Sequence, residues 1–134
     1  MKRINEKLLN SFNRLEQLCN EKYGVKHGVT YYIDEMKKTP YRLSRRYDNW
    51  DQDLQMLVRI RHIRNKLSHG ELSFDDDCCE QKDVDFLNRF SKAIESQCDP
   101  LSIIKAGNHT AGHYVGIVVI VLVIAFLLSL LSRE

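Results

Sequence analysis

A helical pattern covers residues 50–70, WDQDLQMLVRIRHIRNKLSHG. At about 100° per residue, its apolar side chains fall on two arcs of a helix surface. The first arc is a core stripe, formed by Met56, Ile60, Ile63 and Leu67. The second arc starts apolar and ends polar, and it runs through Leu54, Leu57, Val58, Arg61, Arg64, Asn65, Ser68 and His69. We therefore predict a helix that buries one face in its own bundle and offers the other face to a partner.

The segments on either side of this helix carry further helical patterns and stop signals. Apolar residues recur at helical spacing over residues 2–22, and Gly24 follows as a terminator. Asp48 or Asn49 is a suitable N-cap for the helix at residues 50–69, and Gly70 is suited to end it. Further helices are expected over residues 30–38 and 80–97, with a short final turn at 101–105, an irregular segment at 41–48 and a loop at 71–79. We expect an all-α fold, a compact bundle of four to five helices over residues 1–105.

The C-terminal part has a different composition. Residues 106–113 are rich in small residues and are expected to be a linker, and residues 114–131 contain no charge and no proline. A helix of that length spans about 27 Å, close to a hydrocarbon core of about 30 Å. We predict one C-terminal transmembrane helix that anchors the chain to the cell membrane by its tail. Since the N-terminus has no apolar export signal, we expect the preceding domain to be cytoplasmic.

Composition narrows the chemistry. The chain has 134 residues, enough for one domain, and a net charge of +2. Its four cysteines fit no metal-binding spacing, and no carboxylate or His/Cys cluster near residues 61–70 is convincing as a metal site. No metal or cofactor is therefore expected. An acidic stretch over residues 71–85 is best explained as a solvated face. The middle of the chain is basic and suits a polyanion such as RNA, through Arg42, Arg45, Arg46, Arg59, Arg61, Arg64 and Lys66.

Arg64, Asn65 and His69 carry the most specific chemistry. Arginine binds phosphate with a fork of fixed donors, and a neutral histidine transfers protons near pH 7. Metal-free RNA cleavage by internal transesterification needs a base, an acid and positive charge at the phosphate. We expect His69 to transfer protons, Arg64 to bind the scissile phosphate and Asn65 to orient His69 or the backbone. A homodimer through this helix would bring two copies of each group together, with Arg45, Arg46, Arg59, Arg61 and Lys66 binding RNA.

The residues alone support a second interpretation equally well. Cations are favourable at a helix C-terminus, so His69 and Gly70 are also typical of capping residues at the end of a basic helix face. His109 and His113 are four residues apart and could share a metal in a helix, but we expect them to belong to the linker.

The segment Arg64-Asn65-Lys66-Leu67-Ser68-His69 resembles the R-N-x3-H signature of HEPN-domain ribonucleases. With Ile63 before it, and with residues 85–87 and 99–101, it is similar to small bacterial HEPN proteins of mobile and defence-related loci. This resemblance implies a helical bundle, a homodimer with a composite site, metal-independent endoribonuclease activity and a role as a toxin or anti-phage effector. It also implies a regulatory or antitoxin protein as partner. Toxins controlled by a nucleotidyltransferase antitoxin usually carry tyrosine two positions after the histidine, where this chain has Glu71.

The sequence therefore leads to a membrane-tethered HEPN-type endoribonuclease with RNA as its substrate. The alternative is a non-catalytic, membrane-anchored adaptor that binds RNA or a protein. A third interpretation is a small membrane sensor or a pore-forming effector, in which the apolar segment 114–131 is the active part.

Overall fold

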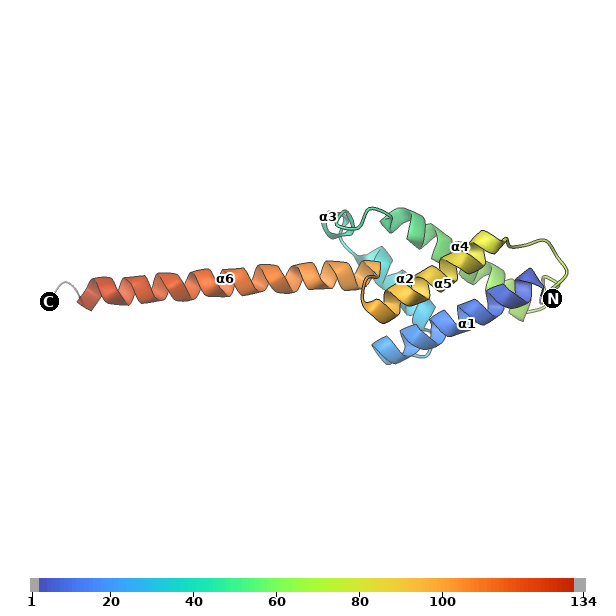
Figure 1. Ribbon diagram of the computed structural model, residues 1–134, viewed down its shortest axis with the longest axis horizontal. Coiled ribbons are helices and arrows are strands. Elements are labelled where there is room, and N and C mark those ends of the chain that lie inside the picture. Colours follow the sequence, from blue (N-terminus) through green and yellow to red (C-terminus); the bar gives the residue numbers. More distant parts are fainter. Residues whose placement is uncertain (1–2, 132–134) are drawn as a thin grey trace.

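The computed structural model describes residues 3–131, without the side chains of residues 108–114 and 131. The described chain is all-α. Its helices are α1 (Ile4–Tyr23), α2 (Gly28–Lys38), α3 (Tyr41–Ser44), α4 (Trp50–Ser68), α5 (Gln81–Ser96) and α6 (Pro100–Leu131). Helices α1, α2, α4 and α5 form a bundle, and α6 leaves it as a single rod (Figure 1). The all-α class is thus as expected, while α3 falls where residues 41–48 were expected to be irregular.

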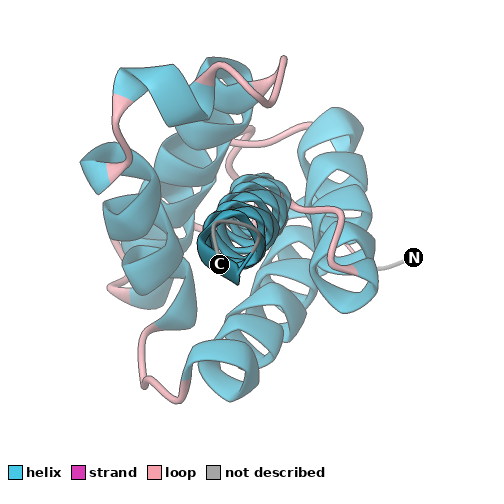
Figure 2. Ribbon diagram, turned by 90° about the vertical axis from the view of Figure 1, so that its left-hand side faces the viewer, coloured by secondary structure: helices cyan, strands magenta, loops and turns pink. Residues whose placement is uncertain are grey.

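The bundle is built around α1, which packs mainly on α5 and also on α2 and α4. Its apolar residues recur every three or four positions and lie in the core. Gly24 ends the helix with φ 65°, a left-handed conformation that glycine adopts without steric cost. Figure 2 looks along α6 and shows the bundle helices arranged behind it.

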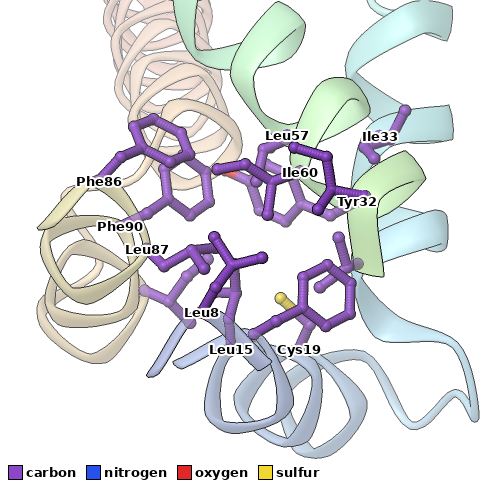
Figure 3. Close-up of a cluster of buried hydrophobic side chains, with 14 of the residues drawn as sticks. Leu8, Leu15, Cys19, Tyr32, Ile33, Leu57, Ile60, Phe86, Leu87 and Phe90 are labelled. Carbon is purple, nitrogen blue, oxygen red and sulfur yellow. The ribbon is translucent and has the colours of Figure 1, made fainter. Parts of the chain in front are cut away.

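Side chains from four helices meet in one apolar core (Figure 3). The ring of Tyr32 meets the ring of Phe90 edge-on, with centroids 5.3 Å apart. Leu8 and Leu15 of α1 and Ile60 of α4 are completely buried beside them. Burial of this apolar surface holds the four helices together.

Helix α4 buries a slightly different stripe from the one predicted. Ile60, Ile63 and Leu67 are in the core as expected, but Leu57 joins them at 1% exposure, and Met56 is only partly buried. Leu54 and Val58 are partly covered by the same core. The second apolar arc is therefore smaller than the sequence indicated, because its central member faces inward.

Helix α2 begins at Gly28, two residues before the start predicted at residue 30. The cause is a close approach to α1, since a Cβ on Gly28 would lie 2.5 Å from the backbone nitrogen of Asn20. Gly28 N–H donates to Oδ1 of Asn20 at 2.7 Å, and Val29 N–H donates to Oε2 of Glu16 at 2.8 Å. Side chains of α1 thus satisfy the free N–H groups at the start of α2, a role that helices usually give to a local cap.

The C-terminal segment requires a correction. Helix α6 runs without a break through residues 106–113, which were expected to be a linker. Among residues 3–131, no helix combines the length and the apolar character that crossing a bilayer requires. The predicted transmembrane helix at 114–131 and the localisation as a tail-anchored membrane protein are therefore wrong.

The loop between α4 and α5 is held by one buried side chain. Asn5 is completely buried, and its Nδ2 donates to the backbone carbonyls of Phe74 at 2.9 Å and Asp76 at 2.7 Å. Its Oδ1 accepts from the thiols of Cys78 at 3.2 Å and Cys79 at 2.9 Å. An asparagine amide has two donors and two acceptor lone pairs, so this carboxamide is fully satisfied.

We predict that Asn5→Ala lowers the free energy of unfolding by about 2–4 kcal/mol, because it leaves two loop carbonyls without their donor. Urea denaturation followed by circular dichroism measures the change. Asn10→Ala is the matched control, since Asn10 lies on the same helix but is exposed, and it should change stability by less than about 0.5 kcal/mol. Equal stability of the two variants would contradict the assigned role of Asn5.

Candidate functional site at the end of helix α4

The polar end of α4 is formed by Asn65 and His69, both exposed. The backbone N–H of His69 donates to the carbonyl of Asn65 at 3.0 Å, and Gly70 ends the helix with φ 71°. Residues four apart lie on one helix face, so the two side chains are neighbours. Within the described part of the chain, the imidazole of His69 makes no hydrogen bond or ion pair and is open to a ligand.

Arg64 lies on the flank of α4 that faces α1. Its guanidinium carbon is 5.4 Å from the centre of the Phe12 ring, and its Nη1 donates to Oδ1 of Asn65 at 3.2 Å. Its Nε is buried and has no hydrogen-bond partner among residues 3–131. We expected Asn65 to orient His69 or the backbone, and the structure shows its side-chain oxygen bound to Arg64.

A single protomer does not bring Arg64 and His69 to the same face. Five residues separate them, which corresponds to about 140° around a helix. Arg64 lies against Phe12, whereas His69 is exposed on the outer side. A site that uses both groups on one phosphate needs a movement of Arg64 or a second copy of the chain.

Arg59 is engaged in the fold. It forms an ion pair with Asp83, which is completely buried at the start of α5. Asp83 also accepts the backbone N–H of Glu80 at 2.9 Å, as part of a capping box. Arg59 therefore compensates a buried carboxylate, and this role competes with the RNA contact predicted for it.

The other predicted RNA-binding residues are spread over the molecule. Arg61 reaches Thr30 of α2 in a long contact of 3.4 Å, and Lys66 is partly buried at the opposite edge of α4. Arg45 stacks on the ring of Tyr41 at 5.4 Å, and the guanidinium of Arg46 lies beside Gly107 of α6. Arg61 and Lys66 flank the polar end of α4, whereas Arg45 and Arg46 belong to the region where α3 meets α6.

Two buried aspartates were missed as structural centres. Asp53 accepts the Tyr47 hydroxyl at 2.8 Å and lies 3.4 Å from Nη2 of Arg89, and burial together with this hydrogen bond raises the pKa of Tyr47 to about 12. Asp53 stands in the first turn of α4, where an acidic residue is favourable even without a buried partner. The available signal was its position four residues before Leu57, on the stripe that α4 buries.

Asp99 is the second buried aspartate that the sequence did not reveal. It is completely buried and accepts hydrogen bonds from the Tyr32 hydroxyl at 2.6 Å, from the ammonium of Lys22 at 2.9 Å and from the Ser102 hydroxyl at 2.6 Å. Burial and this carboxylate raise the pKa of Tyr32 well above its usual range. The cluster places the start of α6 on the bundle, which the sequence indicated only as a turn.

A pocket between α4 and α5 lies away from the polar end of α4. It has a volume of about 480 Å³ and opens beside Asp53, Phe86 and Arg89, and Arg64 and His69 do not line it. In the described residues, no group of three or more His, Cys, Asp or Glu side chains could hold a metal ion. The side chains of His109 and His113 lie outside those described. Asn65 and His69 are themselves exposed at the end of α4.

The fold and this surface define an all-α protein with an exposed polar helix end. Residues 6–115 match the Family of unknown function (DUF6548), and the chain belongs to that family. No curated protein matches the chain, and no solved structure does. The family description assigns no activity, so the HEPN resemblance stays a hypothesis based on Arg64, Asn65 and His69.

We predict that Arg59→Gln lowers the free energy of unfolding by about 1–3 kcal/mol, because it leaves the buried Asp83 carboxylate without its cation. Arg61→Gln is the control on the same helix, and it should cost less than about 0.5 kcal/mol because its contact with Thr30 is long. Thermal and urea unfolding measure both variants. A larger loss of stability for Arg61→Gln than for Arg59→Gln would contradict the assigned role of Arg59 in pairing with Asp83.

Proposed function

We propose that this protein is a metal-independent endoribonuclease of the HEPN type, with RNA as its substrate and a role as a toxin or anti-phage effector. The observation that supports the proposal most directly is the exposed, unpaired imidazole of His69, one helical turn from the Asn65 side chain that binds Arg64. A proton-transfer group and a phosphate-binding group are thereby joined through one residue.

The environment of Arg64 supports a role in phosphate binding. A buried N–H without a partner costs free energy, and Nε of Arg64 is such a group. Rotation of the side chain toward the helix end would release this donor from the Phe12 ring and offer a forked donor to a phosphate oxygen. The free energy regained when Nε leaves its buried, unpaired position would offset part of the free energy needed to move Arg64.

In the proposed reaction, one His69 takes the proton from the ribose 2′-hydroxyl, and the 2′-oxygen attacks the adjacent phosphorus. Protonated His69 of a second copy gives its proton to the departing 5′-oxygen. Arg64 stabilises the negative charge on the phosphate during the attack. The products are a 2′,3′-cyclic phosphate and a 5′-hydroxyl. Because an acid and a base are needed at once, the site is composite and the active form is a homodimer through α4.

The test is incubation of purified protein with mixed RNA in EDTA, followed by analysis of the new ends for 2′,3′-cyclic phosphate. His69→Ala should lower the cleavage rate at least about 100-fold, and Arg64→Ala should lower it by a similar factor. His62→Ala is the matched control, since His62 is also exposed on α4. Cleavage by both site variants at the wild-type rate would refute the assignment. RNA binding without cleavage by the wild-type protein would favour the adaptor.

The dimeric site has its own test. Wild-type protein and His69→Ala protein are mixed in equal amounts under conditions that exchange subunits. The activity is compared with that of the same total amount of wild-type protein. If both copies supply a histidine, only homodimers of the wild-type chain cut RNA, and about a quarter of that activity remains. If each protomer acts alone, about half remains. Cross-linking or light scattering on the same samples confirms that mixed dimers have formed.

A further inference from the structure

Cys78 and Cys79 are adjacent in sequence, and their thiols point to the same atom. Both donate to Oδ1 of Asn5, at 3.2 and 2.9 Å, so the distance between the two sulfur atoms cannot exceed the sum of these lengths. In a regular extended strand, consecutive side chains point to opposite faces, so this arrangement is a specific feature of the loop.

The pair is reachable from solvent on one side. Cys78 is partly exposed and Cys79 is buried at 5% exposure. Both line a pocket of about 230 Å³ together with Arg59, Asp77, Glu80 and Asp83. A small molecule such as hydrogen peroxide can therefore approach Cys78 first, while Cys79 lies behind it.

We propose that Cys78 and Cys79 are an oxidation site, at which hydrogen peroxide forms a reversible disulfide between the two neighbouring residues. The Cys78 thiolate attacks one peroxide oxygen, the O–O bond breaks, and a sulfenic acid and hydroxide result. The Cys79 thiolate then attacks the Cys78 sulfur and expels hydroxide, which forms the S–S bond. In sum, two thiols and one peroxide give one disulfide and two water molecules. This inference does not depend on the proposed ribonuclease activity.

Reversibility follows from geometry. Consecutive Cα atoms are about 3.8 Å apart, below the range of about 4.4–6.8 Å found for most disulfides. The bond is therefore strained, and strained disulfides are the ones that small thiols reduce readily. Such a bond suits a signal that is made and removed rather than a permanent crosslink.

Oxidation acts directly on the anchor of the loop. Both S–H donors are consumed, so Oδ1 of the buried Asn5 loses the two hydrogen bonds it accepts. The same carboxamide holds the backbone of Phe74 and Asp76 through its other end. A buried acceptor without a donor is unfavourable, so the segment from residue 74 to 79 should loosen when the disulfide forms.

The rate has a defined dependence on pH. Burial raises the pKa of Cys79 to about 11 and also raises the pKa of Cys78. Since the thiolate is the reactive form, oxidation should be slow at pH 7 and should accelerate as the pH rises toward the pKa values of the pair. The Cys19 thiol, whose pKa burial raises to about 12, lies in the core at 1% exposure and should stay reduced.

The experiment uses the full chain with Cys98→Ser, which removes the exposed thiol that could join two molecules. The protein is treated with hydrogen peroxide at pH 7 and pH 9, free thiols are alkylated, and peptides are analysed by mass spectrometry. We expect the peptide with residues 78 and 79 to lose two hydrogen atoms, about 2 Da, faster at pH 9, and dithiothreitol to restore both thiols. Urea unfolding of the oxidised protein should have a lower midpoint.

Cys78→Ser in the same background is the matched variant, because its hydroxyl can still donate to Asn5. It should show no disulfide and keep the unfolding midpoint after peroxide treatment. Two free thiols in the treated parent protein, or a sulfinic acid on Cys78 in place of the disulfide, would overturn the proposal. An oxidised protein as stable as the reduced one would overturn the part that concerns Asn5.

Discussion

Polar groups buried between helices cost free energy unless they are paired, and in this protein helix α1 provides the partners at the starts or ends of three other segments. Helix α1 binds the loop before α5 through Asn5, the start of α2 through Glu16 and Asn20, and the start of α6 through Lys22. Each contact satisfies backbone or carboxylate groups at the end of another segment. Leaving such groups unpaired costs more than the hydrogen bond itself contributes, so the contacts select one arrangement of the helices. Burial of the apolar core drives folding, and the polar contacts of α1 determine where the other segments lie against it.

This division explains which parts of the fold were predictable from sequence. Apolar spacing is a local signal, and it located the helices at residues 2–22, 50–69 and 80–97 to within two residues. The start of α2 depends on the approach of Gly28 to Asn20, which no local pattern around residue 28 contains. In α6, the small residues at 106–113 suggested a linker, yet the helix that starts at Pro100 continues through them. Propensity is a weak guide where a helix is already nucleated, because each further residue adds a hydrogen bond.

The candidate site shows the same limit. Sequence placed Arg64, Asn65 and His69 at the end of one helix, and this placement is confirmed by α4. It did not predict that Phe12 would hold the Arg64 guanidinium or that Asp83 would engage Arg59, since both partners come from other helices. Charge counts along a chain overestimate the cations available to a ligand for this reason. Arg59 belongs mainly to the fold, whereas Asn65 and His69 remain on the surface.

The loop of residues 70–80 joins the polar end of α4 to the segment that carries Cys78 and Cys79. It begins directly after His69, at Gly70, and ends at Glu80, whose side chain takes part in the capping box of α5 with Asp83. Asp83 in turn pairs with Arg59 of α4, so the loop is fixed at its far end to the same helix it leaves. Asn5 holds it in between. A change at Cys78 and Cys79 therefore acts on a segment that is tied at both ends to α4. Oxidation removes the two hydrogen bonds that Oδ1 of Asn5 accepts, so the segment would then be held less firmly between those ends.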